Sequence, residues 1–377
     1  MSDKKRVMVI FGGQSTEHEV SRFSATSIIN NMDRSKFDVS FVGITKEGRW
    51  VPYNGPVEKI ASGEWEEIAI NEMVKGIPYR DNIINAIVSR GASSEAVIKN
   101  ENKEINGGPI DVVFPVLHGC NGEDGTIQGL FEMAGIPYVG SGVLGSALGM
   151  DKIYAKIVFE KVGVPQAGYL FFTRKEIKEN SDRVADAIEQ RFEYPVFIKP
   201  SNAGSSVGVS KAHDRRELVE ALNFAAKYDR KVLIEEFING REVECAVLGN
   251  DNPIASTVGE VIPCNEFYDY NAKYIDGSSK TVIPANLPAD TILKIREYAV
   301  KAFKALDCAG LSRVDFFVHK ETGEIYINEI NTLPGFTNIS MYPMLWEASG
   351  IPYSELIERL IDLAIERFND NTKEVDN

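Results

Sequence analysis

The sequence predicts an α/β and α+β protein of three lobes, the first of which is built on a parallel sheet. Three observations support this prediction. The 377 residues are enough for two or three domains with cores of their own. Hydrophobic (44%) and charged (25%) residues occur at the levels of ordinary globular proteins. Apolar runs alternate with segments of helical periodicity early in the chain, whereas apolar runs dominate its last third.

Residues 1–140 have the pattern of an N-terminal α/β domain. The expected elements are strands at 7–11, 37–44, 110–117 and near residue 138, and helices at 20–32 and 126–134. Residues 47–107 lack a clean period and contain several Gly, Pro and Asn residues, so we expect an insertion with some helix. Strand–helix alternation of this kind implies a parallel sheet covered by helices.

The rest of the chain changes character near residue 238. We expect a central α+β domain over 141–238, with helices at 152–162, 181–192 and 214–227 and strands at 194–199 and 232–238. A strand-rich domain is expected over 239–377, with strands at 242–248, 254–262, 311–318 and 325–330. Helices are expected at 290–306 and 356–364, and a Tyr-rich loop at 264–288.

Charge and cysteine content exclude several classes of function. The formal net charge of −14 provides no basic footprint for nucleic acid or an anionic membrane. No apolar run near the start is long enough for a signal peptide or a membrane span. The four cysteines are far apart in the sequence, which argues against a disulfide framework or a thiolate zinc site. We therefore expect a cytoplasmic protein that binds neither nucleic acid nor membrane.

Two motif matches fit their sequence context poorly. The G-x-G-x-x-G match at 140–145 follows only a short apolar stretch, so we interpret it as a connecting loop rather than a dinucleotide site. The G-x-S-x-G match at 204–208 would make Ser206 a hydrolase nucleophile, with His213 or His319 as its base. Residues 200–210 are small and polar, and the next helical pattern begins only near residue 214. A loop that cradles phosphate fits them better than a nucleophile elbow.

The strongest chemical signal is a predicted hairpin near the end of the chain. A turn at 320–323 joins two strands, which brings Asp315 opposite Asn328 or Glu329. Residues two apart share a strand face, so Arg313, Asp315, Glu329 and Asn331 should converge, with facing Cβ atoms about 5 Å apart. Two carboxylates and an amide oxygen suit Mg²⁺ that also contacts phosphates. The alternative is an Arg–Asp ion pair beside a solvated face.

Upstream residues extend the hypothesis of a phosphate site. Lys152 and Lys199 are candidates to bind phosphates, and Glu235 and Glu242 flank a strand end that is placed to bind a base.

Three further positions are candidates for contacts with a small substrate. The N–H of Gly335, in the segment after the second hairpin strand, is a candidate donor to a developing oxyanion, as is Arg313. His118 at a strand end is a candidate partner for a carboxylate, and Glu17 for an ammonium group. Their alternatives are a hydrogen-bonded loop histidine and a carboxylate at a helix start.

Five ordered motifs resemble those of the D-alanine–D-alanine ligases. They are FGGQSTEHEVS at 11–21, HGCNGEDGT at 118–126, KPSNAGSSVG at 199–208, EFYDYNAKY at 266–274 and NEINTLPGFT at 328–337. The resemblance runs nearly end to end and is weakest over 47–107. It implies the ATP-grasp fold, with nucleotide between the central and C-terminal lobes, and a homodimer. It also implies that the product serves peptidoglycan synthesis.

The resemblance also implies a mechanism in two steps. ATP phosphorylates one D-alanine to an acyl phosphate, and the amine of a second D-alanine then displaces phosphate. The implied ATP-binding residues are Lys152, Lys199, Ser206, Glu235, Glu236, Ile238, Glu242, Lys273 and Phe317. Two Mg²⁺ ions, for which Mn²⁺ can substitute, are assigned to Asp315, Glu329 and Asn331.

The substrate-binding residues implied by the resemblance lie in all three predicted domains. They are Glu17, His118, Arg313, Ser340 and Met341. A triad of Glu17, Ser205 and Tyr274 is expected to close the site, and Arg313 and the Gly335 N–H to stabilise the oxyanion. Asn271 departs from the acidic residue usual at its position, but it lies between the motif residues.

Three alternatives to this function differ in class or substrate. A D-serine acceptor would differ from D-alanine by one hydroxyl, which an apolar pocket discriminates weakly. A serine hydrolase would use Ser206 and need no ATP. A nucleotide sensor would bind ATP without turnover, but such a protein would be expected to lack part of the set Arg313, Asp315, Glu329, Asn331 and Gly335, and here the whole set is present.

Overall fold

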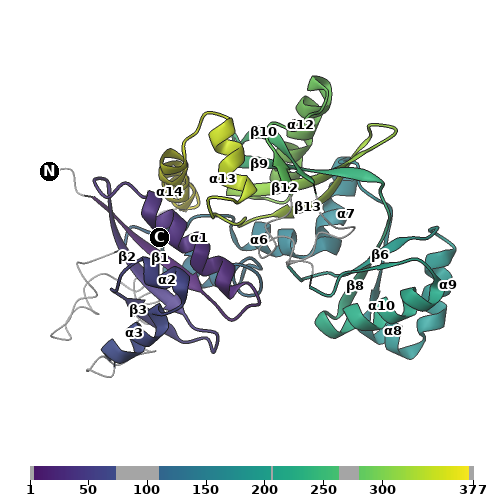
Figure 1. Cartoon of the computed structure of the whole chain (residues 1–377), viewed down its shortest axis with the longest axis horizontal. Coiled ribbons are helices and arrows are strands. Elements are labelled where there is room, and N and C mark those ends of the chain that lie inside the picture. The colour runs from purple at the N-terminus through teal and green to yellow at the C-terminus, as the bar shows by residue number, and fades with distance from the viewer. Residues whose placement is uncertain (1–3, 74–109, 205–206, 263–279, 373–377) are drawn as a thin grey trace.

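The computed structural model describes residues 4–73, 110–204, 207–262 and 280–372, and contains three β-sheets within these ranges (Figure 1). Each sheet has helices against it. In Figure 1 the N-terminal sheet lies on the left, the sheet of the central segment on the right, and the C-terminal sheet between and above them.

The N-terminal sheet has the strand order β3-β2-β1-β4. Its strands are β1 (Lys5–Gly12), β2 (Phe37–Ile44), β3 (Trp50–Tyr53) and β4 (Val112–Val116). β1 runs parallel to β2 and to β4, which confirms the predicted parallel sheet. The antiparallel β3 was not predicted and adds an edge strand to β2. The strand expected near residue 138 is a single parallel bridge between Val113 and Tyr138.

Four helices of the described ranges accompany this sheet, of which the first and last match the helices predicted at 20–32 and 126–134, while the other two lie in the expected insertion. They are α1 (His18–Asn31), α2 (Glu58–Ser62), α3 (Trp65–Met73) and α5 (Thr126–Ala134). α1 begins directly after the turn that follows β1, so residues at its start lie at the carboxyl end of the parallel strands. This is the edge at which open parallel sheets bind ligands.

The central segment forms an antiparallel sheet in the order β5-β8-β6-β7. Its strands are β5 (Tyr169–Thr173), β6 (Val196–Pro200), β7 (Ser210–Ala212) and β8 (Lys231–Glu236). The accompanying helices are α8 (Arg174–Glu179), α9 (Ser181–Glu189) and α10 (Arg215–Tyr228). Buried residues of α9, α10, β6 and β8 make a core separate from the other two sheets. β5, β7 and α8 were not predicted.

The C-terminal sheet has the order β11-β10-β9-β12-β13 and is antiparallel throughout. Its strands are β9 (Gly240–Gly249), β10 (Ile254–Ile262), β11 (Lys280–Val282), β12 (Gly310–His319) and β13 (Ile325–Asn331). One face packs on α7 (Lys152–Val162) and α12 (Ala289–Ala305). The other face packs on α13 (Met341–Ala348) and α14 (Tyr353–Asp370).

The N-terminal and C-terminal lobes share one hydrophobic core. Apolar residues of α14, including Leu356 and Leu360, belong to the same buried cluster as Val7 and Val9 of β1 and Phe114 of β4. α14 also contacts α1 (Figure 1). These two lobes therefore form one packed unit, and both border the cleft described in the next subsection.

The segment with the G-x-G-x-x-G match is not a connecting loop throughout, because α6 (Val143–Met150) begins inside it. A Cβ at Gly145 would lie 2.6 Å from the Asp307 carbonyl oxygen, so this glycine permits close packing of α6 on another part of the chain. Only the isolated bridge at Tyr138 precedes the motif, which agrees with the expectation that no dinucleotide site lies there.

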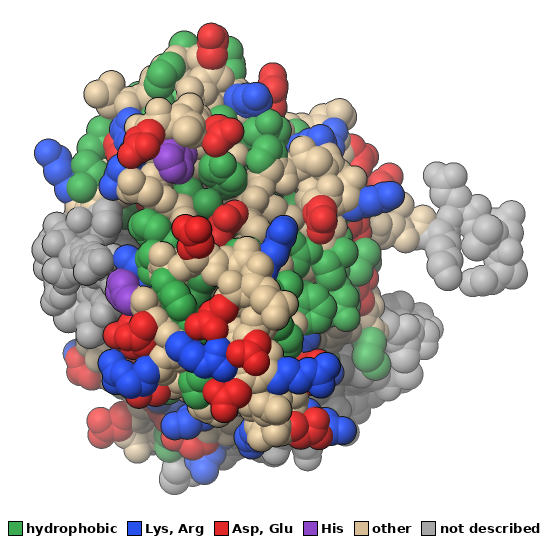
Figure 2. All heavy atoms as spheres, turned by 90° about the vertical axis from the view of Figure 1, so that its right-hand side faces the viewer, with side chains coloured by type: hydrophobic (Ala, Val, Ile, Leu, Met, Phe, Trp, Pro, Cys, Tyr) green, Lys and Arg blue, Asp and Glu red, His purple; other side chains and the backbone are tan. Residues whose placement is uncertain are grey.

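Charges on the outer face of the central sheet are interspersed and paired locally. Figure 2 shows this side of the molecule, with acidic and basic side chains intermingled. Arg215 lies 2.8 Å from Asp186 and 2.5 Å from Glu189. Exposed pairs of this kind contribute little to stability. In the part of the chain that the structure describes, none of the helices combines the length and apolar character that crossing a membrane requires.

Candidate functional site

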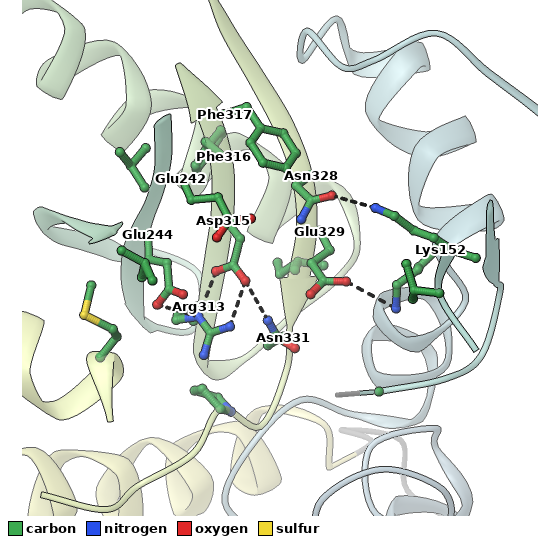
Figure 3. Close-up of a pocket in the computed structure, with 18 of the residues that line it drawn as sticks. Lys152, Glu242, Glu244, Arg313, Asp315, Phe316, Phe317, Asn328, Glu329 and Asn331 are labelled. Atoms are coloured by element: carbon green, nitrogen blue, oxygen red, sulfur yellow. Dashed lines mark hydrogen bonds and ion pairs between the residues drawn. The ribbon is translucent and has the colours of Figure 1, made fainter. Parts of the chain in front are cut away.

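A cleft of about 670 Å³ lies where the three sheets approach one another. Residues of the N-terminal sheet, the central sheet and the C-terminal sheet all line it. Figure 3 shows its floor, where the hairpin β12–β13 and the neighbouring strand β9 carry most of the charged side chains.

The hairpin has the register that the sequence predicts. Asp315 pairs with Glu329, and Arg313 pairs with Asn331. A bulge follows Asp315, so the remaining pairs of the hairpin are offset by one residue. All four side chains line the cleft and lie on one face of the hairpin (Figure 3). This confirms the convergence expected from the alternation of strand residues.

Arg313 is held on both sides by carboxylates. Its Nε and Nη2 donate to the two oxygens of Asp315 at 2.8 and 2.7 Å, and Nε lies 2.9 Å from Glu244 Oε2. Asn331 Nδ2 donates to Asp315 at 3.1 Å. The Arg–Asp ion pair considered as the alternative therefore exists, but it faces the cleft together with Glu329 and Asn331 rather than bulk solvent.

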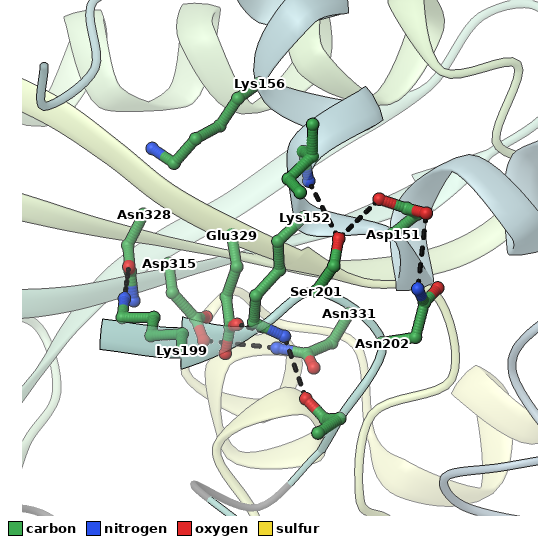
Figure 4. A network of polar contacts seen from close by, with 12 residues as sticks. Asp151, Lys152, Lys156, Lys199, Ser201, Asn202, Asp315, Asn328, Glu329 and Asn331 are labelled. Atoms are coloured by element: carbon green, nitrogen blue, oxygen red, sulfur yellow. Dashed lines mark hydrogen bonds and ion pairs between the residues drawn. The ribbon is translucent and has the colours of Figure 1, made fainter. Parts of the chain in front are cut away.

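Two lysines approach the hairpin from the other side of the cleft. Lys152, at the start of α7, lies 3.2 Å from Glu329 and donates to the Ala203 carbonyl at 3.0 Å. Lys199 of β6 donates to Asn328 Oδ1 at 3.2 Å. These ammonium groups and the hairpin carboxylates thus meet across the cleft, as Figures 3 and 4 show.

Glu235 is a buried carboxylate between two lysines. Its oxygens lie 2.5 Å from Lys156 Nζ and 2.8 Å from Lys199 Nζ. Burial alone would raise the pKa of Glu235, but the charges of Lys156 and Lys199 lower it to about 2. Burial likewise opposes the charge of Lys199, and Glu235 outweighs it, so the pKa of Lys199 is raised. Lys199 therefore stays charged in the cleft wall.

The strand end after Glu235 offers an apolar surface with backbone polar groups. Phe237 is partly exposed and packs on Phe197 at 6.2 Å, with Lys211 Nζ 4.6 Å from its ring centre. The side chain of Glu236 accepts a hydrogen bond from the Gly168 N–H at 2.6 Å. Ile238 is also among the residues that line the cleft here.

Glu242 and Phe317 line the cleft nearby. They face each other in the register of β9 and β12. Their neighbouring strands bring them to the same cleft as the segment after Glu235, so the structure brings the predicted nucleotide-binding residues of the described ranges together.

The N-terminal sheet contributes Glu17 and His118. A Cβ at Gly119 or at Gly204 would lie 2.6 or 2.7 Å from Glu17 Oε2, so the carboxylate of Glu17 lies against both glycines. His118 is buried and bonds to the Leu333 carbonyl at 3.1 Å and to Ser24 Oγ at 3.3 Å.

His118 has a raised pKa despite its burial. Burial would lower the pKa, but Glu123, 3.9 Å away, and Glu17 outweigh it. A histidine of this kind carries positive charge more readily near neutral pH, which suits contact with a carboxylate.

The segment after β13 brings the remaining predicted residues to the cleft. Ser340 Oγ lies 2.8 Å from Thr337 Oγ1 and accepts from the Thr337 N–H at 3.0 Å. A Cβ at Gly335 would lie 3.1 Å from Ser340 Oγ, so these two residues are adjacent. Met341 is buried at the start of α13 and also lines the cleft.

Four predicted site residues lie outside the described residues. They are Ser205, Ser206, Lys273 and Tyr274. Their roles stay predictions. The context of Ser206 argues against a hydrolase, because the element after β6 is the antiparallel strand β7 and the next helix, α10, begins only at Arg215.

Sequence reasoning missed several polar residues that complete the site. Lys156 follows Lys152 by four residues on one helix, and Glu244 follows Glu242 by two on one strand, so periodicity alone was sufficient to find both. Arg241 and Glu260 form a bidentate pair at 2.6 Å in the cleft wall. Their contact joins neighbouring strands whose register the sequence does not specify.

The donor set of Asp315, Glu329 and Asn331 fits a hard divalent cation. All three side chains line the cleft, where Lys152 reaches Glu329 and Asn331 donates its amide N–H to Asp315. Carboxylate and amide oxygens are the ligands that Mg²⁺ prefers. Among residues with described positions, there is no cluster of three or more His, Cys, Asp or Glu side chains arranged as a metal site. Three donors are too few for Mg²⁺ alone, so an ion bound there would need further oxygens, such as those of phosphates.

The arrangement combines three chemical capacities. Lysines stand where phosphates can be held, carboxylates stand where a divalent cation can be held, and Arg313 is fixed where negative charge can be stabilised. This combination suits phosphoryl transfer followed by attack on the activated group.

Comparisons with known proteins agree along the whole chain. Residues 6–141 match the family model described as D-ala D-ala ligase N-terminus, and residues 158–362 match the D-ala D-ala ligase C-terminus. A D-alanine–D-alanine ligase from Acetivibrio thermocellus is 70% identical over the full length of both chains. Another from Ruminiclostridium cellulolyticum is 66% identical over 99% of each.

Solved structures of similar ligases also match nearly the whole chain. A D-Ala:D-Ser ligase from Enterococcus faecalis has 40% identity and a TM-score of 0.80, covering 96% of this chain and 100% of that one. The D-alanine–D-alanine ligase from Coxiella burnetii has 33% identity and a TM-score of 0.79, covering 98% and 96%.

Proposed function

Because the chain belongs to the D-alanine–D-alanine ligase family, we propose that its cleft joins two D-alanine molecules through a D-alanyl phosphate. The reaction consumes ATP, and its dipeptide product serves peptidoglycan synthesis. The fold is the ATP-grasp fold of that family. The observation that carries the assignment to this cleft is the meeting of Arg313, Asp315 and Glu329 with Lys152 and Lys199.

In the first step, a carboxylate oxygen of D-alanine attacks the γ-phosphorus of ATP, and the bond to the bridging oxygen of ADP breaks. Lys152 and Lys199 offset the charge of the phosphates. The pairing of Lys199 with Glu235 keeps it charged and fixes its position. Glu236, Ile238, Glu242 and Phe317 line the part of the cleft proposed for the nucleoside.

Asp315, Glu329 and Asn331 would hold two Mg²⁺ ions, with Mn²⁺ as a substitute. When bound, the ions supply neutralisation of the charge that phosphoryl transfer develops. Glu329 pairs with Lys152, and Asp315 pairs with Arg313. Each carboxylate is therefore held in the cleft by a basic side chain.

In the second step, the amine of the second D-alanine attacks the carbonyl carbon, and phosphate leaves from the tetrahedral intermediate as the amine loses a proton. Arg313 and the Gly335 N–H are proposed to stabilise the oxyanion. Glu17 and His118 would bind the ammonium and carboxylate of the first D-alanine. Ser340 would bind the second carboxylate beside Met341.

The residues outside the described ranges complete the proposal. Ser205 and Tyr274 would form a triad with Glu17, and Ser206 and Lys273 would contact ATP. We also propose three domains, over 1–140, 141–238 and 239–377, because each range holds its own sheet. α7 is an exception in packing, since it lies against the C-terminal sheet. A homodimer in the cytoplasm is proposed on the family resemblance.

A second candidate substrate is D-serine as acceptor. The likeness to a D-Ala:D-Ser ligase at 40% identity supports it. The higher identity to D-alanine–D-alanine ligases favours D-alanine.

Phosphate release from ATP and Mg²⁺ tests the function. We expect release that requires D-alanine, with D-alanyl-D-alanine as the main product even when D-serine or D-lactate is added. A mixed product would overturn the acceptor, and no release with any D-amino acid would overturn the ligase. Hydrolytic activity that needs no ATP and is lost in Ser206→Ala would support the hydrolase instead.

A further inference from the structure

A buried polar network lies behind the cleft, between the start of α7 and residues 201–204 (Figure 4). Its centre is Asp151, the N-cap residue of α7. Asp151, Ser201 and Lys231 do not line the cleft. The mechanism proposed above therefore gives them no contact with substrate.

Both oxygens of Asp151 are occupied. Oδ1 accepts from Ser201 Oγ at 2.5 Å and from the Tyr154 N–H at 3.4 Å, and Oδ2 accepts from Lys231 Nζ and from Asn202 Nδ2 at 3.3 Å. A carboxylate that is almost entirely buried is stable only with this degree of pairing.

The same network fixes the backbone that follows β6. Ser201 accepts from the Lys152 N–H at 3.1 Å through its carbonyl and donates its own N–H to the Lys231 carbonyl at 3.1 Å. Asn202 is held by Asp229, which accepts from its N–H at 2.8 Å and its side chain at 2.9 Å. Residues 201 and 202 are thus tied to α7 and to the start of β8.

Two contacts carry this arrangement into the cleft. Ala203 accepts from Lys152 Nζ at 3.0 Å, and Gly204 lies against Glu17. Because Lys152 directly follows Asp151, one carboxylate sets both the lysine and the loop that faces it.

We propose that Asp151 is a positioning residue, which holds residues 201–204 against Lys152 so that the cleft binds nucleotide with the lysine and the loop already in place. This inference rests on the proposed function and adds to it a residue that touches no substrate. It predicts that nucleotide affinity depends on Asp151 and Ser201 more than D-alanine binding does.

Asp151→Asn is the informative variant. Asparagine caps a helix as well as aspartate does, so α7 keeps its N-cap. The amide NH₂, however, replaces an acceptor that now faces two donors, Lys231 and Asn202. Ser201→Ala removes the hydroxyl on the other oxygen and serves if the first variant does not fold.

The experiment is calorimetric titration with a non-hydrolysable ATP analogue and Mg²⁺, followed by steady-state kinetics. We expect the dissociation constant to rise about ten-fold in each variant, as for loss of a charged hydrogen bond, while the KM for D-alanine changes less than about two-fold. The effects of the two variants should not be independent in the double variant, because both act on the same carboxylate.

Asp214→Asn is the matched control, since Asp214 caps α10 by accepting from the Glu217 N–H at 2.8 Å and is exposed away from the cleft. Unchanged nucleotide affinity in both Asp151→Asn and Ser201→Ala would overturn the proposal. So would a parallel loss of nucleotide and D-alanine binding with a lowered Tm, the result of a merely structural role. A wild-type chain that binds no nucleotide would overturn the proposed function and this inference together.

Discussion

Glu235 lies buried with a lysine at each oxygen, and the network leaves one excess positive charge in the cleft wall. Burial of an isolated carboxylate is costly, so the two ammonium groups are what keep it ionised. The excess charge of this cluster faces the place proposed for phosphates. Stability and ligand binding are therefore linked at this residue.

Glu235→Gln should lower the free energy of unfolding at pH 7 by about 3–5 kcal/mol, because two lysines lose their buried partner. The folded-state pKa of Glu235 is about 2 against an ordinary 4.5, so its contribution is full above pH 4.5 and is lost as pH falls toward 2. The difference in unfolding free energy between wild type and variant should shrink by about 2 kcal/mol as the pH falls from about 6 to about 3. Urea unfolding at each pH measures it.

Glu220→Gln is the control for this variant, because Glu220 forms only an exposed pair with Arg216. It should change the unfolding free energy by less than about 1 kcal/mol at any pH. A difference between wild type and Glu235→Gln that stays constant with pH would contradict the assigned pKa.

Gly204 shows how a missing side chain shapes the site. The carboxylate of Glu17 lies where a Cβ at position 204 would be, at 2.7 Å. Gly204→Ala should displace that carboxylate and raise the KM for D-alanine several-fold, since Glu17 is proposed to bind the first ammonium group. Steady-state kinetics with each substrate varied in turn measure the effect.

Gly129→Ala is the matched control for Gly204→Ala. Apart from its chain neighbours and the backbone of its own helix, no heavy atom lies within 4 Å of a Cβ there, and Gly129 is inside α5. We expect unchanged kinetics and a gain of about 0.5–1 kcal/mol in stability, as for Gly to Ala in a helix. An equal KM increase in both variants would show that the contact with Glu17 is not the cause.

At the scale of secondary structure elements, the hairpin β12–β13 is the element on which the chemistry depends. Its alternation puts apolar residues such as Val314 and Phe316 into the core and leaves the charged residues on the cleft side. The pairing of Asp315 with Glu329 is fixed by backbone hydrogen bonds on both sides of β12, with β9 and with β13. The donor set is thus preorganised on a rigid element.

Glu329→Gln should raise the Mg²⁺ concentration required for half-maximal activity by about ten-fold or more, because an amide is a weaker ligand than a carboxylate. Glu324→Gln, at the exposed turn of the same hairpin, should leave that concentration unchanged. Magnesium titrations of ATP turnover distinguish the two. A similar shift in both variants would contradict the assigned metal site.

The sequence predicted the elements whose pattern is long or regular, including β2, β10, α5 and α7. It missed α13, because Pro343 reads as a breaker although it lies in the first turn, where its lack of an N–H costs nothing. It also missed β5, β7 and β11, which are short strands whose existence depends on neighbours distant in the sequence.

The site residues also fall into those that a local sequence pattern predicts and those that it does not. The set Arg313, Asp315, Glu329 and Asn331 follows from strand alternation and one turn. The pairing of Glu235 with Lys156 and the polar network around Asp151 join segments about 50 to 80 residues apart. No local pattern encodes such contacts, because they arise where side chains of α7, which packs on the C-terminal sheet, reach residues of the central segment.

At the scale of the whole molecule, two of the lobes share a hydrophobic core and the third has its own. The N-terminal sheet shares one apolar cluster with α13, α14 and a face of the C-terminal sheet, whereas the central sheet has its own. One exposed ion pair, Lys5 with Asp362, also links β1 to α14. The two larger lobes should therefore open together, and the central sheet separately.

Leu360→Ala, in α14, should cost about 2–5 kcal/mol and speed amide exchange in β1 and β12 alike, while β6 and β8 keep their protection. Leu222→Ala, in α10, should have the reverse pattern. Hydrogen exchange read by mass spectrometry tests both, with Leu293→Ala on the exposed face of α12 as the control. Equal acceleration in all three sheets would contradict separate units.

The shared core also affects how the chain folds during its synthesis. β1 and β4 leave the ribosome early, but α14, which belongs to the same apolar cluster, begins only about 240 residues after the end of β4. At roughly 5–20 residues per second, that interval is on the order of ten to fifty seconds. Until α14 emerges, the nascent N-terminal sheet lacks part of its core, whereas the central sheet can close as soon as β8 has emerged.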